Sequence, residues 1–419
     1  MCQQHEHGTL SGARETRLAA DTTQSREPFP WDVGVFDAHC HPTDTLGSVA
    51  SISRMKARAL TVMSTRSQDQ DLVVDVASEQ GVTGSKALYS SGQEDSGRRI
   101  IPSFGWHPWF SYQIYDDTAP NPTYDGTPEG KVAHYDKILS PPPTSKDASF
   151  SKGLQDPRPL SEFISETRAR LEKHPLALVG EIGLDKAFRI PDSWTKSAEV
   201  QRDEELTPGG REGRRLSPHR VNLDHQTAVL KAQLRLAGEM RRAVSVHGVQ
   251  VHGGVYNALA DCWRGHEKEV LSRREQRKVA KNAEDFSSDD EDDSGIAGGQ
   301  EELRPLPFPP RICLHSYSGP LNILNQYTHK SVPAKVFFSF STAINWDPEG
   351  GDKNKKTEEM IRGCPDDRIL VESDLHTAGD QMDQALEDIC RKVCDIKGWE
   401  LRKGVEQLGR NYRQFIFDE

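Results

Sequence analysis

The sequence lacks the features that place a chain in or across a membrane. No stretch approaches the roughly 18 consecutive apolar residues of a membrane span, and residues 1–20 lack the apolar core of a secretory signal peptide. Hydrophobic residues make up 35% of the chain and charged residues 28%. We therefore expect no membrane partner and an intracellular protein, cytoplasmic and/or nuclear, with a real core and substantial polar insertions.

Cysteine pairs with metal-binding or redox spacing are also missing. The seven cysteines are scattered, none stands in a C-x-x-C pair, and Cys390 and Cys394 lie four apart on a predicted helix. This pattern argues against a disulfide framework and favours reduced thiols in an intracellular protein.

An excess of basic residues is absent too. Lys and Arg total 53 against 64 Asp and Glu, so the formal net charge is -11. A protein whose main task is to coat nucleic acid is usually basic, which argues against that class. An enzyme that processes nucleic acid in a local basic cleft stays open.

Polar, Pro/Gly/Ser-rich or charge-rich stretches interrupt the chain. We interpret residues 1–30 as a flexible leader and residues 31–419 as a single domain with loop insertions at 116–158, 190–220 and 264–310. None of the three insertions looks like packed structure, and the last contains an acidic block typical of solvated chain. The basic run at 272–278 suggests nuclear import, although a charged helix face fits it as well.

Between the insertions, short apolar runs recur and predict buried parallel strands. There are eight of them, at 33–39, 59–65, 100–107, 176–183, 243–248, 311–317, 335–341 and 368–374. Helical patterns separate most of these runs, and alternating strands and helices imply a parallel sheet. Eight units favour an α/β fold closed into a (β/α)8 TIM-type barrel, with a C-terminal helix that packs Leu401, Val405, Leu408 and Phe415 on one face.

Metal-binding side chains stand at the ends of six of these strands. The first run ends in Asp37-Ala38-His39-Cys40-His41, and residues two apart in an extended segment point to the same side. The other runs end in, or just before, His107, Glu181, His247, His315 and Asp374. Catalytic residues of such barrels come from the carboxyl ends of the strands, so we expect a metal site there.

The residue types indicate which ions would bind. Four imidazoles and two carboxylates exceed the needs of one tetrahedral zinc ion and suit two divalent ions that share a carboxylate. The mixed nitrogen and oxygen set admits Zn, Mn, Fe or Ni, with Mg less natural. The cofactor we expect is one or two divalent ions, Zn, Mn or Mg.

These motifs resemble the TatD family of metal-dependent deoxyribonucleases, within the amidohydrolase-like barrels. The resemblance rests on the HxH after the first strand, GWHPW at 105–109, GEIGLD at 180–185, LHSYSG at 314–319 and ESD at 372–374. It covers the barrel from about 33 to 417. The long insertions are similar to the fungal branch of the family, some members of which were described as interactors of an anaphase-promoting-complex subunit.

The resemblance implies roles for the candidate residues. His39 and His41 would bind a first metal with Asp374, Glu181 would bridge, and His247 and His315 would hold a second ion. Asp374 would also orient or deprotonate the attacking water. His107 would face the substrate phosphate, and Asp185 would support the ligands from behind. These are the catalytic and metal-binding residues that we predict.

Two departures from the family pattern lie near the substrate. The family often has Ser-Arg-Asp after its strand-five histidine, where this chain has Gly248-Val249-Gln250. It usually has Ala-Pro after the final aspartate, where Leu375-His376 stands here. These changes bear on the substrate more than on metal binding.

Three functions follow as hypotheses. The first is a metal-dependent hydrolase of phosphodiester bonds in DNA, a 3′→5′ exonuclease that uses metal-activated water. Insertion residues such as Arg211, Arg214 and Arg215 would then face phosphates, unless they are only solvated loop charge. The second is a hydrolase of a small amide, lactone or phosphoester. The third is a scaffold that binds a protein partner of a cell-cycle complex through its insertions.

Overall fold

The computed structural model describes residues 27–88, 97–146, 149–194, 199–200, 202–270 and 304–417. All eight predicted strands are present. They are β1 Phe36–Cys40, β2 Ala59–Met63, β3 Ile100–Ser103, β7 Val179–Asp185, β9 Val244–Val249, β10 Arg311–Leu314, β11 Lys335–Phe340 and β12 Ile369–Val371. Nearly every residue in them is buried, as expected of parallel strands covered on both sides.

The strands form a three-stranded sheet in the order β1-β2-β3 and a five-stranded sheet in the order β12-β11-β10-β9-β7. All pairings within the two sheets are parallel. Backbone hydrogen bonds join the sheets at both edges. Leu178 N donates to Pro102 O at 3.0 Å beside β3, and Asp374 N donates to His39 O at 3.1 Å beside β1. The (β/α)8 barrel predicted from the sequence is thereby confirmed.

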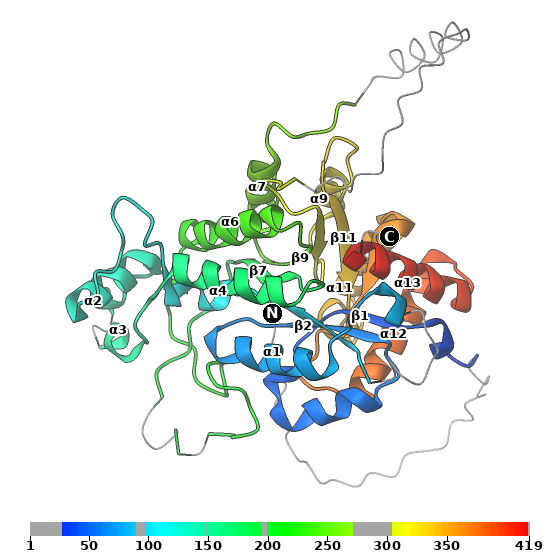
Figure 1. Ribbon diagram of the computed structural model, residues 1–419, viewed down its shortest axis with the longest axis horizontal. Helices are drawn as coiled ribbons and strands as arrows, with labels where there is room; N and C mark the ends of the chain where they lie inside the picture. Colours follow the sequence, from blue (N-terminus) through cyan, green and yellow to red (C-terminus); the bar gives the residue numbers. More distant parts are fainter. Residues whose placement is uncertain are drawn as a thin grey trace, which may run out of the picture.

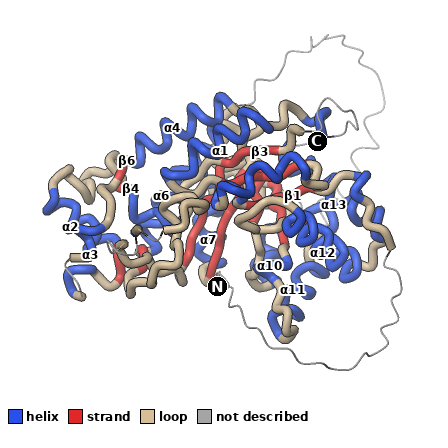
Figure 2. The backbone as a smooth tube through the Cα atoms, turned by 90° about the horizontal axis from the view of Figure 1, so that it is seen from below, coloured by secondary structure: helices blue, strands red, loops and turns tan. Residues whose placement is uncertain are grey.

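Helices follow the strands around the barrel, and Figures 1 and 2 show them outside the central strands. They are α1 Ser67–Gln80, α4 Leu160–Lys173, α6 Leu223–Glu239, α7 His252–Trp263, α9 Leu321–Tyr327, α10 Thr342–Asn345, α11 Asp352–Gly363, α12 Asp380–Lys397 and α13 Leu401–Phe417. No helix in the described residues is long and apolar enough to cross a membrane.

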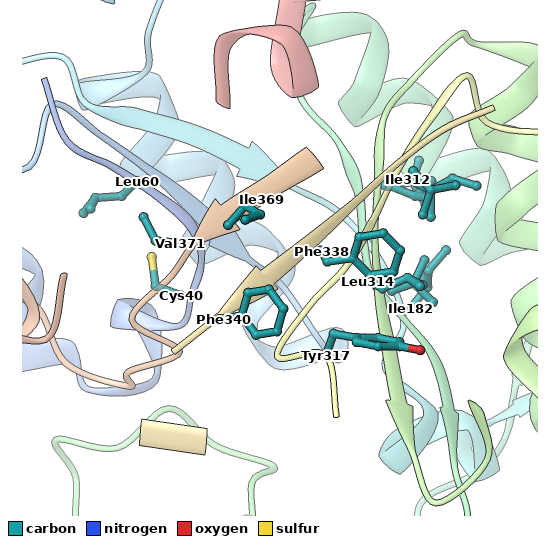
Figure 3. Packing of buried hydrophobic residues seen from close by; sticks show 14 of the residues in the cluster. Cys40, Leu60, Ile182, Ile312, Leu314, Tyr317, Phe338, Phe340, Ile369 and Val371 are labelled. Atoms are coloured by element: carbon teal, nitrogen blue, oxygen red, sulfur yellow. The ribbon is translucent and has the colours of Figure 1, made fainter. Parts of the chain in front are cut away.

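The predicted apolar face of the last helix is confirmed. Leu401, Val405, Leu408 and Phe415 of α13 are all buried. The larger core cluster lies in part around β10, β11 and β12, where Figure 3 shows Ile312, Leu314 and Phe338 packed together.

A second apolar cluster lies one layer below the polar residues of the barrel. It joins α13 to residues in or directly before every barrel strand, namely Phe36, Ala38, Ala59, Ile101, Leu178, Ala243, Cys313, Phe337 and Leu370. Two residues further along, on the same side of their strands, stand the buried polar residues Thr61, Ser103, Ser245, Ser339 and Glu372. His247 and Asp374 stand two residues beyond Ser245 and Glu372. The period of two thus builds an apolar floor and a layer of mainly hydroxyl groups, and in β9 and after β12 it places a candidate ligand above them.

The stretch 116–158 contradicts the expectation that it lacks packed structure. It contains α2 Pro128–Ile138, α3 Phe150–Gly153 and the short strands β5 Leu139–Ser140 and β6 Arg158–Pro159, which pair with β8 Arg220–Val221 and β4 Ile114–Tyr115. A separate apolar cluster holds it together: Tyr112, Tyr135, Ile138, Leu139, Phe150, Leu154, Ile190 and Val221. These eight scattered apolar residues are too few to stand out in a proline-rich sequence. Figure 1 shows α2 and α3 at one end of the molecule.

The second insertion, 190–220, is fastened to the mouth of the barrel. The buried Arg66, which follows β2, donates to Pro208 O at 2.8 Å and to Thr207 O at 3.2 Å. The same guanidinium pairs with Asp44 at 2.9 Å and with Asp69 at 3.0 Å. The insertion therefore forms part of the wall around the mouth. Residues 1–26 of the predicted leader and 271–303 of the third insertion, with its basic run at 272–278, lie outside the described residues.

Candidate metal centre

The structure brings all eight predicted site residues together at the carboxyl ends of the strands. His39 lies in β1 and His41 directly after it, while His247 lies in β9 and His315 directly after β10. Asp374 follows β12. Two positions differ from the prediction: β3 ends at Ser103, so that His107 stands at the start of the 3₁₀ helix η6 (Pro108–Gln113), and Glu181 is the third residue of β7 rather than its last. Apart from Asp374, each of these residues is at most 8% exposed. The side chain of Asp374 is 9% exposed.

One group of ligand atoms surrounds the Oε2 atom of Glu181. The Nε2 atoms of His39 and His41 lie 3.4 and 3.3 Å from it and 3.1 Å from each other. Oδ1 of Asp374 lies 3.8 Å from His39 Nε2 and 3.6 Å from His41 Nε2. Ligand atoms of His39, His41 and Glu181 therefore form one candidate metal group, and Asp374 Oδ1 lies beside its two histidines.

A second group surrounds the other oxygen of the same carboxylate. Oε1 of Glu181 lies 2.7 Å from His315 Nε2, 2.9 Å from His247 Nδ1 and 3.0 Å from His107 Nε2. His247 Nδ1 and His315 Nε2 are 3.1 Å apart. Glu181 thus separates two clusters of imidazoles, one on each carboxylate oxygen.

The distances between donor atoms fit divalent ions. A tetrahedral ion with bonds of about 2.0–2.2 Å holds its ligand atoms about 3.3–3.6 Å apart. The spread of 3.1–3.8 Å around Glu181 Oε2 brackets that range. The second group is tighter, at 2.7–3.1 Å, and its atoms would have to separate by a few tenths of an ångström to admit an ion. Nitrogen and carboxylate oxygen are the donors that Zn, Mn and related ions take in proteins.

His107 differs from the other imidazoles in its hydrogen bonds. Its Nδ1 accepts the backbone N–H of Trp109 at 3.1 Å, so the remaining proton of the neutral ring belongs on Nε2, which faces Glu181. Burial lowers the pKa of His107 to about 4, which keeps the ring neutral at pH 7. A protonated Nε2 is a hydrogen-bond donor and cannot bind a metal, since a ligand nitrogen needs a free lone pair. His107 is therefore placed to donate a hydrogen bond toward the site.

The outer nitrogens of two candidate ligands are held from behind. His39 Nδ1 lies 2.8 Å from Ser245 Oγ, and His247 Nε2 lies 3.2 Å from Asp185 Oδ2. Such partners fix the orientation and tautomer of a metal-binding histidine. Asp185 also accepts from the indole Nε1 of Trp109 at 2.6 Å. Burial would raise the pKa of Asp185, but its contact with His247 outweighs burial and lowers it well below the usual range.

The neighbouring histidines determine whether the Glu181 carboxyl group is ionised. Burial alone would raise its pKa, yet the facing imidazoles of His107, His315 and His39 hold it well below the usual range. The carboxylate is therefore ionised and stands among histidines on both oxygens. A buried anion so surrounded is suited to pair with cations.

Glu372, the first residue of the ESD motif, was not among the predicted site residues. Glu372 is fully buried, and its Oε1 accepts from Ser316 N at 2.7 Å and lies 3.7 Å from His315 Nδ1. Ser339 also donates to it. Its position two residues before Asp374, on the same side of the strand, was the available signal. His376, one of the departures from the family pattern, is exposed; it stacks on His41 with ring centroids 5.1 Å apart and pairs with Asp44 at 2.7 Å.

Backbone strain concentrates at this mouth. Asp374 has a φ of 52°, Ser316 of 42° and Gln250 of 56°, and each stands within three residues of the end of a barrel strand. Residues other than glycine adopt this left-handed region at a cost, and such residues cluster where a site dictates the backbone. Asp37 anchors the turn at Asp374, since its buried carboxylate accepts from Ser373 N at 3.1 Å and from Ser373 Oγ at 2.5 Å.

Several known proteins are similar to this chain. The family described as TatD related DNase matches residues 36–416. The Cut9-interacting protein scn1 of Schizosaccharomyces pombe is 35% identical over 382 residues, which are 91% of this chain and 98% of the relative. An uncharacterized deoxyribonuclease of Saccharomyces cerevisiae is 26% identical over 344 residues, covering 81% of this chain and 82% of its own. The crystal structure of an uncharacterized amidohydrolase from Saccharomyces cerevisiae superposes with a TM-score of 0.51 at 12% identity, over 93% of this chain and 100% of the other, which supports the fold alone.

Proposed function

We propose that this chain, which belongs to the TatD-related DNase family, is a metal-dependent hydrolase that cleaves phosphodiester bonds in DNA as a 3′→5′ exonuclease. The observation that carries the proposal is the division of ligand atoms over the two oxygens of Glu181. Oε2 faces His39 and His41, and Oε1 faces His247 and His315. Two divalent ions on either side of one bridging carboxylate form the recurring centre of phosphatases and nucleases.

Each residue has a separate task in this proposal. His39, His41 and Asp374 would hold a first ion, His247 and His315 would hold a second, and Glu181 would serve both. When bound, such ions lower the pKa of water and neutralise negative charge on the phosphate. The second carboxylate oxygen of Asp374 accepts from Ser316 Oγ at 3.4 Å, and its remaining lone pair would orient the attacking water and take its proton.

His107 completes the site from the side of the second group. Its Nε2–H faces Glu181 Oε1 at 3.0 Å and would turn to a non-bridging oxygen of the phosphate when the substrate binds. Because the ring is neutral, it contributes a directed hydrogen bond rather than a full charge. Asp185 has no contact with substrate in this scheme and acts by holding His247.

A second function is suggested by the Schizosaccharomyces pombe relative, whose name records an interaction with Cut9. We propose that this chain also binds a protein partner of that kind through the insertion at 264–310. Deletion of residues 271–303 should abolish capture of the partner and leave DNA cleavage intact. Loss of both, or of neither, would contradict a separate binding role for that segment.

Cleavage itself is tested with a substrate panel. The protein is freed of metal with a chelator, reloaded with Mn, Zn or Mg, and offered single-stranded DNA labelled at its 5′ end beside small esters, amides and lactones. We expect metal-dependent shortening from the 3′ end and at most slow turnover of the small molecules. Turnover of a small amide or lactone without DNA cleavage would replace DNA by that substrate class.

A further inference from the structure

Two aromatic rings stack at the edge of the metal centre. Trp109 follows His107, and Phe188 lies in the loop after β7; their ring centroids are 4.5 Å apart with an interplanar angle of 9°. The Trp109 ring also contacts the imidazole of His107 at 4.8 Å. Both Trp109 and Phe188 are only half-buried. A stacked pair that served the core alone would be buried, so this pair offers aromatic surface to the mouth.

Cationic side chains flank this surface. The loop reads Lys186-Ala187-Phe188-Arg189, and both Lys186 and Arg189 are exposed. Within the part of the chain that the structure describes, neither takes part in an ion pair. An aromatic ring between unpaired cations is the combination with which proteins bind single-stranded nucleic acid, through base stacking and phosphate contacts.

A single carboxylate links this surface to the metal centre. Oδ1 of Asp185 accepts the backbone N–H groups of Ala187 at 2.6 Å and Phe188 at 2.8 Å. Oδ2 accepts from the Trp109 indole at 2.6 Å and lies 3.2 Å from His247 Nε2. The loop, the stacked pair and a candidate metal ligand are therefore positioned by the same residue.

We propose that Trp109 and Phe188 form a stacking platform for the nucleobase next to the scissile phosphate, with Lys186 and Arg189 contacting the neighbouring phosphates. The inference rests on the proposed function, since it names the part of a DNA substrate that the site would hold. The aromatic surface recognises any base by its π face, so it would position the strand without selecting sequence.

Binding of a fluorescent oligonucleotide tests the platform without cleavage. A single-stranded oligonucleotide with 2-aminopurine at its 3′ end is titrated with the full chain in Ca2+, and quenching of the base fluorescence reports stacking on an aromatic ring. We expect quenching with the parent protein, a roughly tenfold weaker Kd with Phe188→Leu, and recovery with Phe188→Tyr. Phe29→Leu is the matched control, because Phe29 is also half-buried against a tryptophan, Trp31, and has no part in the site.

Two further arms separate the outcomes. Replacing the terminal base by an abasic site should raise KM for cleavage roughly tenfold in the parent and have no such effect in Phe188→Leu. Lys186→Gln and Arg189→Gln should each reduce the salt dependence of binding by about one unit of slope. Cleavage of DNA without quenching, or equal binding by the Phe188→Leu and Phe29→Leu variants, would overturn the platform and leave the proposed function standing. Quenching without cleavage would support the platform and remove the nuclease activity.

Discussion

Asp185→Asn tests whether one carboxylate supports both the metal centre and the loop beside it. The amide can keep one oxygen toward the N–H groups of Ala187 and Phe188, but its NH2 then faces the Trp109 indole N–H and His247 Nε2. If His247 binds an ion through Nδ1, its Nε2 carries a proton. The amide NH2 would then face two other hydrogen-bond donors, the Trp109 indole N–H and the His247 Nε2–H, with no acceptor between them. Loss of such a partner typically weakens metal affinity 10- to 100-fold, about 1.4–2.7 kcal/mol.

The assay is calorimetric titration of Zn or Mn into chelated parent and variant protein, with kcat and KM on DNA measured in parallel. We expect the affinity of one ion to fall by that factor, while the other ion binds as in the parent. Asp125→Asn is the control, since Asp125 is exposed and also accepts a backbone N–H, that of Thr127, far from the centre. Equal affinity of Asp185→Asn and parent for both ions would refute the reasoning.

Three further changes have distinct expected results. Glu181→Gln removes the bridging charge and should reduce the metal content from two ions to at most one, measured by elemental analysis, with DNA cleavage lost; two retained ions would contradict the bridge. Arg66→Met leaves Asp44 and Asp69 without their buried cation and should lower the free energy of unfolding by about 3–5 kcal/mol in urea, a loss that a merely surface-lying arginine would not cause. Burial lowers the pKa of His134 to about 4, below the value of about 6.5 for an unfolded chain, so the unfolded state takes up its proton first and stability is lost as the pH falls from 6.5 toward 4. The parent should therefore lose on the order of 2 kcal/mol more than His134→Gln between pH 7.5 and pH 5, and parallel pH profiles would refute this.

The barrel, and the position of the candidate ligands at its mouth, could be predicted from the sequence because both depend on short-range patterns. Eight apolar runs mark the strands, and a polar residue at the end of a parallel strand must lie at the same mouth as the others. His39 and His41 are predictable by their spacing alone. Glu181 was found although it stands inside β7, because GEIGLD is a local motif.

What the sequence could not predict depends on contacts between distant segments. The unit around α2 is stabilised by residues from 112 to 221 whose apolar side chains show no period. Arg66 shows no sign in sequence of its hydrogen bonds to residues 207 and 208. Glu372 was overlooked because its partner, Ser316, lies 56 residues away. The stacking of Trp109 on Phe188 likewise joins two loops that only the fold brings together.

The central claim, that this centre hydrolyses DNA with bound metal, is tested most directly by comparing the parent with Asp374→Asn. Asparagine keeps the shape of the side chain and tolerates the φ of 52° at this position, so the fold should be preserved. After chelation and reloading with Mn, we predict that the parent shortens 5′-labelled single-stranded DNA and that the variant does not. Cleavage by both proteins alike, or none by the metal-loaded parent, would contradict the account.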